Sequence, residues 1–225
     1  MLCSGVSLRR CALNLNVHFM TAYNRFLWLG KLAQSKQLEF VLSINSSKEL
    51  YLDEMESIEH TKLKPVSIPL LVDEHQRILG VGACEIPAKG YLAEISRKKY
   101  GSRVSQSTEL IEKLLNQINQ DYVPEVVKSD GKRSYVQLIK NRWSSNLLMH
   151  TIYENKKSDK SREQLYLNSE KRRFDPLFAI NQRCAKLRSD VKRLVRRSWC
   201  TTKKIENLSL HLQIYACYNN QIKLV

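Results

Sequence analysis

Apolar positions change their spacing along the chain, and each change marks a different kind of element. Between residues 5 and 34 they recur at helical intervals in two stretches, so we predict two helices. Asn16 lies between the two stretches, where a residue that tolerates the left-handed conformation suits a tight turn. Helix, tight turn, helix is the layout of a helix-turn-helix, and an ordinary pair of antiparallel helices is the alternative.

The second of these helices is expected to show different residues on its two faces. Its expected apolar face consists of Met20, Tyr23 and Leu27. In a helix-turn-helix, the polar residues near the start of the second helix face bases or phosphates. Here those residues are Thr21, Asn24 and Arg25.

After residue 48 the pattern becomes typical of strands. Three successive runs are rich in aliphatic residues: Leu50–Ile58, Val66–Val72 and Arg77–Ile86. The polar residues between the second and third runs suit a hairpin loop. We therefore predict three sequential antiparallel strands.

Helices and strands then alternate. We predict an amphipathic helix at Ser105–Asn119, a strand at Val123–Lys128, a short helix at Ser134–Lys140 and a strand at Leu147–Tyr153. Residues 154–173 are mostly charged and polar without a clear period, and we interpret them as an insertion.

Two more helices follow the insertion. Asp175 and Pro176 are a favourable start for the first, because aspartate caps a helix and proline suits its first position. Its apolar residues recur from Leu177 to Leu194, and the final helix is predicted at Ile205–Leu224.

Three antiparallel strands, followed by parallel strands added through helices, is the order of the ribonuclease-H-like fold. We therefore predict an α/β fold: a ribonuclease-H-like mixed sheet with flanking helices, preceded by a small all-α helix-turn-helix. The expected boundaries are 1–36 for the helix-turn-helix, 37–48 for a linker and 49–225 for the sheet domain.

Composition narrows the class of partner. The 225 residues include 37 Lys or Arg and 22 Asp or Glu, which gives a net charge of +15. Such a surplus favours a polyanion. Because no apolar run approaches the roughly 18 residues of a membrane span, nucleic acid is favoured over a membrane. The six cysteines form no C-x-x-C motif, so we expect reduced thiols rather than a zinc site or disulfides.

On this fold two carboxylates have predictable places. Asp53 lies in the first strand, and Asp130 directly follows the fourth strand, which lies beside the first. Carboxylates that meet there can share Mg²⁺ or Mn²⁺, the ions used for phosphodiester displacement. Asp130 is equally explained as the first residue of an Asp-Gly turn. Glu54 competes with Asp53, because alternation along a strand allows only one of them to face the site.

The chain also resembles a known family through several motifs in the same order. They are GVSLRRCA, LDEMESIEHTKLKP, PAKG, SRKKYG, SDGKRSY and KLRSDVKRLVRRSWCTTKK. Over nearly its whole length the sequence is similar to the DDE-type transposases of short bacterial insertion sequences. The resemblance implies metal-dependent cleavage and strand transfer at the ends of the element. It also implies that Asp53 and Asp130 are the first two catalytic acids and hold Mg²⁺ or Mn²⁺.

The third acid departs from the family pattern. The family's glutamate on the last long helix corresponds to Asn181, whose amide oxygen can ligate a metal but carries no charge. Asp175 and Glu170 are the alternatives, although helix capping also explains Asp175. Loss of the third carboxylate would make the chain an inactive DNA-binding remnant or regulator, and a structure-selective nuclease is a further alternative.

The start of the chain departs too, because the family often carries a zinc ribbon before the helix-turn-helix. We interpret this as an N-terminally truncated copy, in which Cys3 is either the last trace of the ribbon or a chance cysteine.

The resemblance implies a partner and a cellular place. The partner is double-stranded DNA, the terminal inverted repeats of the element, bound by a homodimer or a higher assembly. The expected location is the bacterial cytoplasm, at the nucleoid, with no membrane contact. Besides the three polar residues of the second helix, the residues expected to contact DNA are Arg9, Arg10, Lys62, Lys98, Lys99, Arg188, Arg193, Arg196, Arg197, Lys203 and Lys204.

Overall fold

The structure is a computed structural model, and it describes residues 1–143, 149–153, 175–195 and 200–224. The expected insertion at 154–173 lies outside these residues. Within the described part, no helix has the length and apolar character that crossing a membrane requires.

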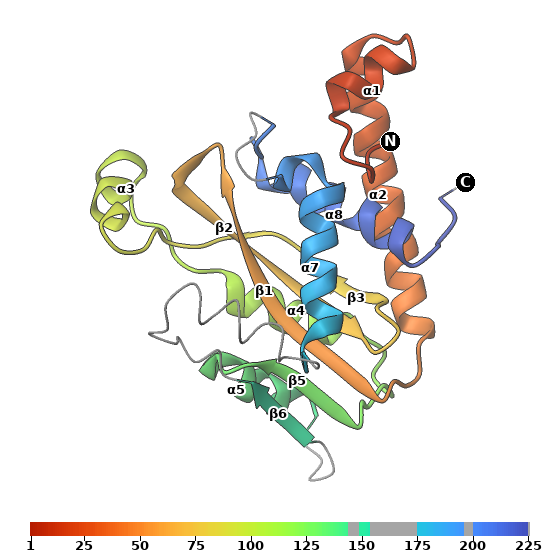
Figure 1. Cartoon of the computed structure of the whole chain (residues 1–225), viewed down its shortest axis with the longest axis vertical. Coiled ribbons are helices and arrows are strands. Elements are labelled where there is room, and N and C mark those ends of the chain that lie inside the picture. Colours follow the sequence, from red (N-terminus) through yellow and green to blue (C-terminus); the bar gives the residue numbers. More distant parts are fainter. Residues whose placement is uncertain (144–148, 154–174, 196–199, 225) are drawn as a thin grey trace, which may run out of the picture.

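A mixed sheet forms the centre of the molecule (Figure 1). Its strands follow the order β3-β2-β1-β5-β6, and the short β4 pairs with β2. β1, β2 and β3 are antiparallel, whereas β5 lies parallel to β1 and β6 parallel to β5. This is the ribonuclease-H-like arrangement that the sequence predicted. The strands are β1 Glu49–Glu59, β2 Thr61–Asp73, β3 Ile78–Val81, β4 Cys84–Glu85, β5 Val126–Asp130 and β6 Met149–Tyr153.

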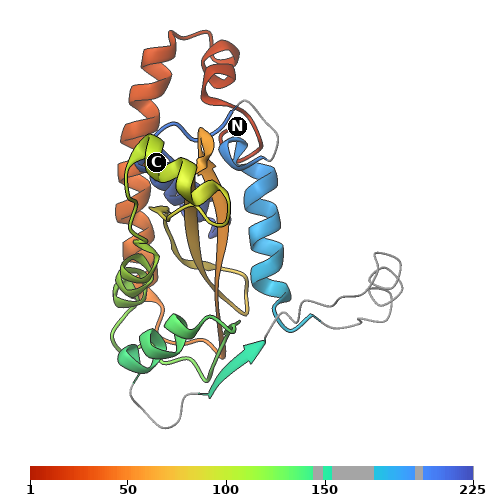
Figure 2. The ribbon, with the colours of Figure 1, turned by 90° about the vertical axis from the view of Figure 1, so that its left-hand side faces the viewer.

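Helices cover both faces of the sheet because each strand alternates apolar residues between two cores. Tyr51 and Met55 of β1 belong to the core shared with α7 (Phe178–Asp190) and α8 (Ile205–Asn219). Leu50 and Leu52 belong to the core on the opposite face, which includes α4 (Ser107–Gln117) and α5 (Arg133–Arg142). Figure 2 shows the sheet between α7 and the helices of this opposite face.

The N-terminal helices are continuous with this core. α1 spans Leu8–Asn14 and α2 spans Phe19–Ser43, and Asn16 between them has a φ of 51°, so the expected left-handed turn is present. Phe26 and Ala33 of α2 lie in the core of α7 and α8. The first seven residues of the expected linker, 37–43, are the last turns of α2.

The last turns of α2 protect the edge strand β3, because an unpaired strand edge invites pairing with other chains. Gln37 is buried, and its Nε2 donates to the carbonyl oxygen of Ile78 at 2.6 Å. Asn220, just beyond α8, donates to the same oxygen at 2.8 Å and accepts from the Ile78 N–H at 2.8 Å.

The expected strand at Arg77–Ile86 is divided into β3 and β4, and two helices also differ from expectation. A helix that the sequence analysis did not predict, α3 (Leu92–Tyr100), lies beside the tip of the β1–β2 hairpin (Figure 1). The long helix predicted from Asp175 begins at Phe178 and ends at Asp190, and a short 3₁₀ helix follows at Lys192–Leu194.

Candidate active site

The two aspartates singled out in the sequence lie side by side on neighbouring parallel strands. Leu52 and Ser129 are the last pair between β1 and β5, and Asp53 and Asp130 are the next residues of the two strands. Tyr51 and Lys128 pair two residues earlier, and the Lys128 Nζ lies 5.3 Å from the centroid of the Tyr51 ring. Alternation places Asp53 and Asp130 on that same face, beneath α7.

The electrostatics of Asp53 reflect this neighbourhood. Burial raises the pKa of Asp53 to about 6 from 3.8, and the negative charge of Asp130 adds to the increase. The Glu54 N–H, which donates to Asp53 Oδ1 at 2.7 Å, and the positive charge of Arg188 act in the opposite direction. Burial and a neighbouring carboxylate therefore both disfavour the ionised form of Asp53, which is the environment of an acid that a cation would stabilise.

Glu54 points to the other face of the sheet, so alternation resolves the competition between it and Asp53. Its carboxylate lies among Ser67, Ser107, Lys132 and Tyr135. Burial acts to raise the pKa of Glu54, but the hydrogen bonds from Lys132, Ser107 and Ser67 outweigh it and leave the pKa below its ordinary value.

The third position lies on α7. Cys184 and Arg188 both interact electrostatically with Asp53, so their face of α7 lies over Asp53. Asn181 comes one helical turn before Cys184 on this face and is exposed. Its Nδ2 donates to Asp175 Oδ2 at 2.9 Å. The amide oxygen of Asn181 takes no part in this bond.

The alternatives for the third acid fare differently. Asp175 Oδ1 accepts from the Leu177 N–H at 2.9 Å, so Asp175 holds the chain that leads into α7. Glu170 lies outside the described residues. Among the residues that the structure places, no three His, Cys, Asp or Glu side chains gather as a metal site would require.

The donor set fits one class of metal ion. Mg²⁺ is usually bound by one or two carboxylates together with waters and substrate phosphates, so it does not need a complete protein cage. Asp53 and Asp130 supply two such carboxylates, and the raised pKa of Asp53 is consistent with a cation beside it. The residues present therefore fit a divalent cation whose remaining ligands are water or phosphate oxygens.

A groove of about 650 Å³ opens near the carboxylates, between the β1–β2 hairpin and the segment after α7. We call it the hairpin groove. Its wall includes apolar side chains such as Met55 and Leu194, and Arg188 connects it to Asp53. Glu56 on its rim pairs with Lys89 at 2.5 Å. The cationic side chains along the hairpin groove are Lys62, Lys89, Arg188 and Arg193.

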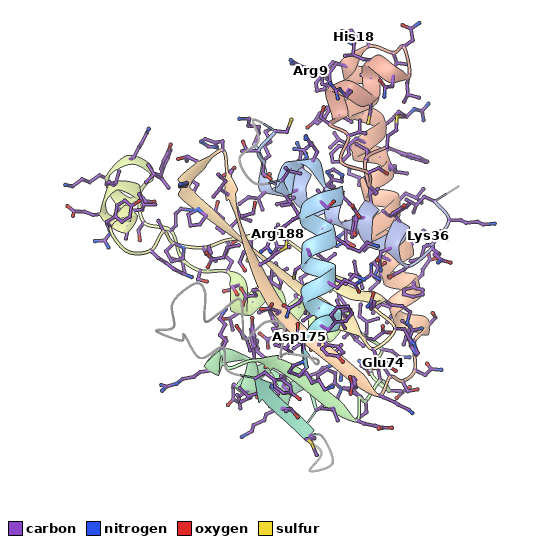
Figure 3. All side chains as sticks on the ribbon, in the orientation of Figure 1. Arg9, His18, Lys36, Glu74, Asp175 and Arg188 are labelled. Carbon is purple, nitrogen blue, oxygen red and sulfur yellow. The ribbon has the colours of Figure 1, made fainter. Side chains whose placement is uncertain are left out.

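The other residues expected to contact DNA divide between two regions. One region is the α1–α2 end, where Arg9 lies far from Arg188 along the molecule's longest axis (Figure 3). The residues exposed there are Arg9, Arg10, Thr21, Asn24 and Arg25. The other region surrounds the hairpin and the start of α8, where the exposed residues are Lys62, Lys98, Lys99, Lys203 and Lys204.

Three of the cationic side chains expected to contact DNA also make contacts within the protein. Lys98 pairs with Glu94 at 2.9 Å, and Lys99 lies 5.5 Å from the centroid of the Tyr100 ring. Arg193 is partly buried, its guanidinium carbon lies 5.5 Å from the centroid of the Phe26 ring, and burial lowers its pKa. Arg196 and Arg197 lie outside the described residues.

The residues around Glu54 were not predicted from the sequence. Lys132 was not singled out, although it follows Asp130 by two positions. The available signal was that Glu54 shares the strand of Asp53 and must face the opposite side of the sheet.

Comparison with known proteins shows distant structural likenesses only. No family model matches the sequence, and no curated protein matches it. The catalytic core domain of BIV integrase aligns over 74% of this chain and 96% of its own, with 15% identity and a TM-score of 0.27. A chain of the simian T-cell lymphotropic virus intasome, in complex with PP2A regulatory subunit B56 gamma, aligns over 75% of this chain and 57% of its own, with 14% identity and a TM-score of 0.30. The Mos1 strand transfer complex aligns over 96% of this chain and 72% of its own, with 9% identity and a TM-score of 0.33.

Proposed function

We propose that this chain is a DDE-type transposase that cleaves DNA and transfers strands at the ends of a bacterial insertion sequence. One observation carries the proposal: Asp53 and Asp130 lie side by side on parallel strands, and α7 brings Arg188 to Asp53. Divalent Mg²⁺ or Mn²⁺ held there would activate the attacking oxygen and stabilise the leaving oxygen. The motif resemblance of the sequence supports the same activity.

Within this proposal each residue has a distinct role. Asp53 and Asp130 hold the metal ions, and Asn181 contributes its amide oxygen as the third ligand. Arg188 neutralises charge beside Asp53 and contacts a phosphate of the strand. The helix-turn-helix at the α1–α2 end contacts the terminal inverted repeats, in a dimer or larger assembly on DNA, through Arg9, Arg10, Thr21, Asn24 and Arg25.

A test of the proposal is a Mn²⁺-dependent cleavage and strand-transfer assay on the DNA that flanks the gene. The expected result is cleavage at the element ends and joining of the freed strand to a second DNA. Cleavage without preference for the inverted repeats, and without joining, would favour a nuclease instead.

A second candidate is an inactive DNA-binding remnant, and the uncharged Asn181 favours it. If Asn181 is a ligand, Asn181→Ala should lower the cleavage rate by more than about tenfold, because an amide oxygen leaves the metal site. The matched control is Ser189→Ala on the exposed side of α7, which should cleave normally. Cleavage that appears only after Asn181→Glu would identify the remnant.

The hairpin groove should contribute phosphate contacts. Replacing Lys62 by glutamine should weaken DNA binding and reduce the slope of log affinity against log salt by about 0.9, because one fewer counterion is released. Binding titrations at several salt concentrations measure this slope. Lys36→Gln is the control, since Lys36 lies on α2 and pairs with Glu39 at 2.8 Å. Equal slopes for Lys62→Gln and the unaltered chain would exclude a phosphate contact there.

A further inference from the structure

The carboxylate of Glu54 accepts from donors on β2, α4 and α5 and from the turn after β5. Oε2 accepts from the hydroxyls of Ser67 on β2 and Ser107 at the start of α4, the latter at 2.6 Å. Oε1 accepts from the Tyr135 hydroxyl of α5 at 2.9 Å and from the Lys132 Nζ. The Glu54 side chain is only 11% exposed, so both of its oxygens depend on these partners.

Lys132 connects this carboxylate to Asp130. It lies two residues after Asp130, and its backbone N–H donates to the Asp130 carbonyl oxygen at 2.5 Å. The same N–H lies 3.4 Å from Asp130 Oδ1. Its Nζ reaches back across the end of the sheet to Glu54 and to Ser107 Oγ, which is 3.2 Å away. The turn that follows Asp130 is thus tied to β1.

The Glu54–Lys132 contact matters for the site because Glu54 is adjacent to Asp53 in β1. Glu54 is the residue after Asp53, and alternation sends the two side chains to opposite faces of the same strand. The Glu54–Lys132 contact therefore joins the backbone next to Asp53 to the backbone next to Asp130. The contact links β1 and the turn after β5 just beyond the last β1–β5 pair, where Asp53 and Asp130 lie.

We infer that Glu54 and Lys132 act as a clamp that fixes the separation of the Asp53 and Asp130 carboxylates. Both are positioning residues, because neither side chain faces the metal site. The inference rests on the proposed function, since it concerns the site where Asp53 and Asp130 hold the metal. A purely structural network would stabilise α4 and α5 on the sheet without influencing metal affinity.

Binding of Mn²⁺ to the full chain, followed by electron paramagnetic resonance without DNA, tests the clamp. Lys132→Met should weaken Mn²⁺ binding by about tenfold, the lower end of the range for partners that orient metal ligands. Lys132→Arg should restore most of the affinity, because it keeps a cation within reach of Glu54. Glu54→Gln keeps the shape of the side chain and should weaken binding too, which covers the case in which Lys132→Met does not fold.

Two controls separate positioning from stability. Tyr135→Phe removes a hydrogen bond from the same carboxylate but leaves the Lys132 tie intact, so it should lower the urea midpoint with unchanged Mn²⁺ affinity. Lys36→Met removes a remote surface cation and should change neither quantity.

The outcomes distinguish the clamp from the proposed function. Unchanged Mn²⁺ affinity in Lys132→Met and Glu54→Gln, with affinity lost in Asp53→Asn and Asp130→Asn, would overturn the clamp alone. Equal weakening by Tyr135→Phe and Lys132→Met would also overturn it. Mn²⁺ binding that survives Asp53→Asn and Asp130→Asn, or that is absent from the unaltered chain, would overturn both.

Discussion

Replacing Asp53 or Asp130 by asparagine is expected to lower the rates of DNA cleavage and strand transfer by about a thousandfold or more. Each variant removes one of the two carboxylates that meet at the end of the β1–β5 pair. Charge stabilisation by a metal ion contributes several kcal/mol to such a reaction, and each 1.4 kcal/mol corresponds to about tenfold in rate. The measurement is the rate of Mn²⁺-dependent cleavage under single-turnover conditions.

DNA affinity provides the control for these variants. The expected DNA contacts lie on α1, α2 and the hairpin groove, so affinity should be retained or slightly increased as negative charge is removed. Loss of cleavage with retained binding supports the assignment of the two aspartates. Cleavage retained in either variant would refute it.

Asp53→Asn should also raise the stability of the metal-free chain. The pKa of Asp53 in the folded protein is about 6, above the ordinary value of 3.8, so the folded state holds this proton more tightly than the unfolded state does. Ionisation of Asp53 therefore lowers stability progressively as the pH rises from about 4 to about 6, and the full loss is present at pH 7. At 1.36 kcal/mol per pKa unit and with solvent screening, the gain on substitution is about 1–2 kcal/mol.

Urea unfolding at two pH values checks this sign. At pH 7 the asparagine variant should unfold at higher urea than the unaltered chain, and near pH 4 the difference should nearly disappear because Asp53 is then protonated. A substitution that removes activity and adds stability is the pattern expected of a functional residue. A lower midpoint at pH 7 would mean that Asp53 stabilises the fold.

The strand order and the meeting of the two aspartates could be predicted because both depend on the sequence of elements. Once β1 and β5 are neighbours and parallel, Asp53 and Asp130 must lie at the same end of the pair. The Glu54 clamp could not be predicted in this way. Lys132 and Ser107 reach Glu54 from a turn and from a helix start, whose packing depends on the whole fold.

The helix α2 shows a second limit of the sequence. Its expected apolar face was wrong at Met20, which is 48% exposed, whereas Ala22 and Phe26 are buried. The buried side carries small residues because α8 comes very close: a Cβ at Gly30 would lie 2.7 Å from the Leu210 Cβ. Hydrophobic periodicity favours large side chains and gives little weight to the small residues that close helix packing requires.

The end of α2 and the helix α3 were missed for a related reason. Gln37 is polar yet buried, because it hydrogen-bonds to the edge strand, so a polar composition suggested a linker where a helix continues. In α3 the buried residue is Ser96, whose hydroxyl donates to the Leu63 carbonyl at 2.7 Å. A helix held by a serine has no apolar stripe to detect.

Replacing Asp73 by alanine should lower the free energy of unfolding by about 2–3 kcal/mol, because it breaks a buried ion pair. Asp73 is fully buried at the end of β2, where the hairpin to β3 begins. Its Oδ2 accepts from the Arg77 Nε at 2.5 Å, and its Oδ1 accepts from the Arg77 N–H at 2.8 Å. Alanine would leave a charged group and a backbone donor without their partner. The Arg77 side chain is 34% exposed, so water recovers part of the loss.

The companion variants determine how much of this loss belongs to the pair. Removing both partners, in Asp73→Ala with Arg77→Met, should recover part of the stability, because no charge is then left without a counter-ion. Glu39→Ala removes an exposed ion pair with Lys36 and should cost less than about 0.5 kcal/mol. Urea unfolding followed by circular dichroism measures all three. If Asp73→Ala and Glu39→Ala lower the free energy of unfolding equally, the buried carboxylate does not stabilise the β2–β3 hairpin. The hydrogen bonds from Gln37 of α2 and from Asn220 to Ile78 would then hold this connection.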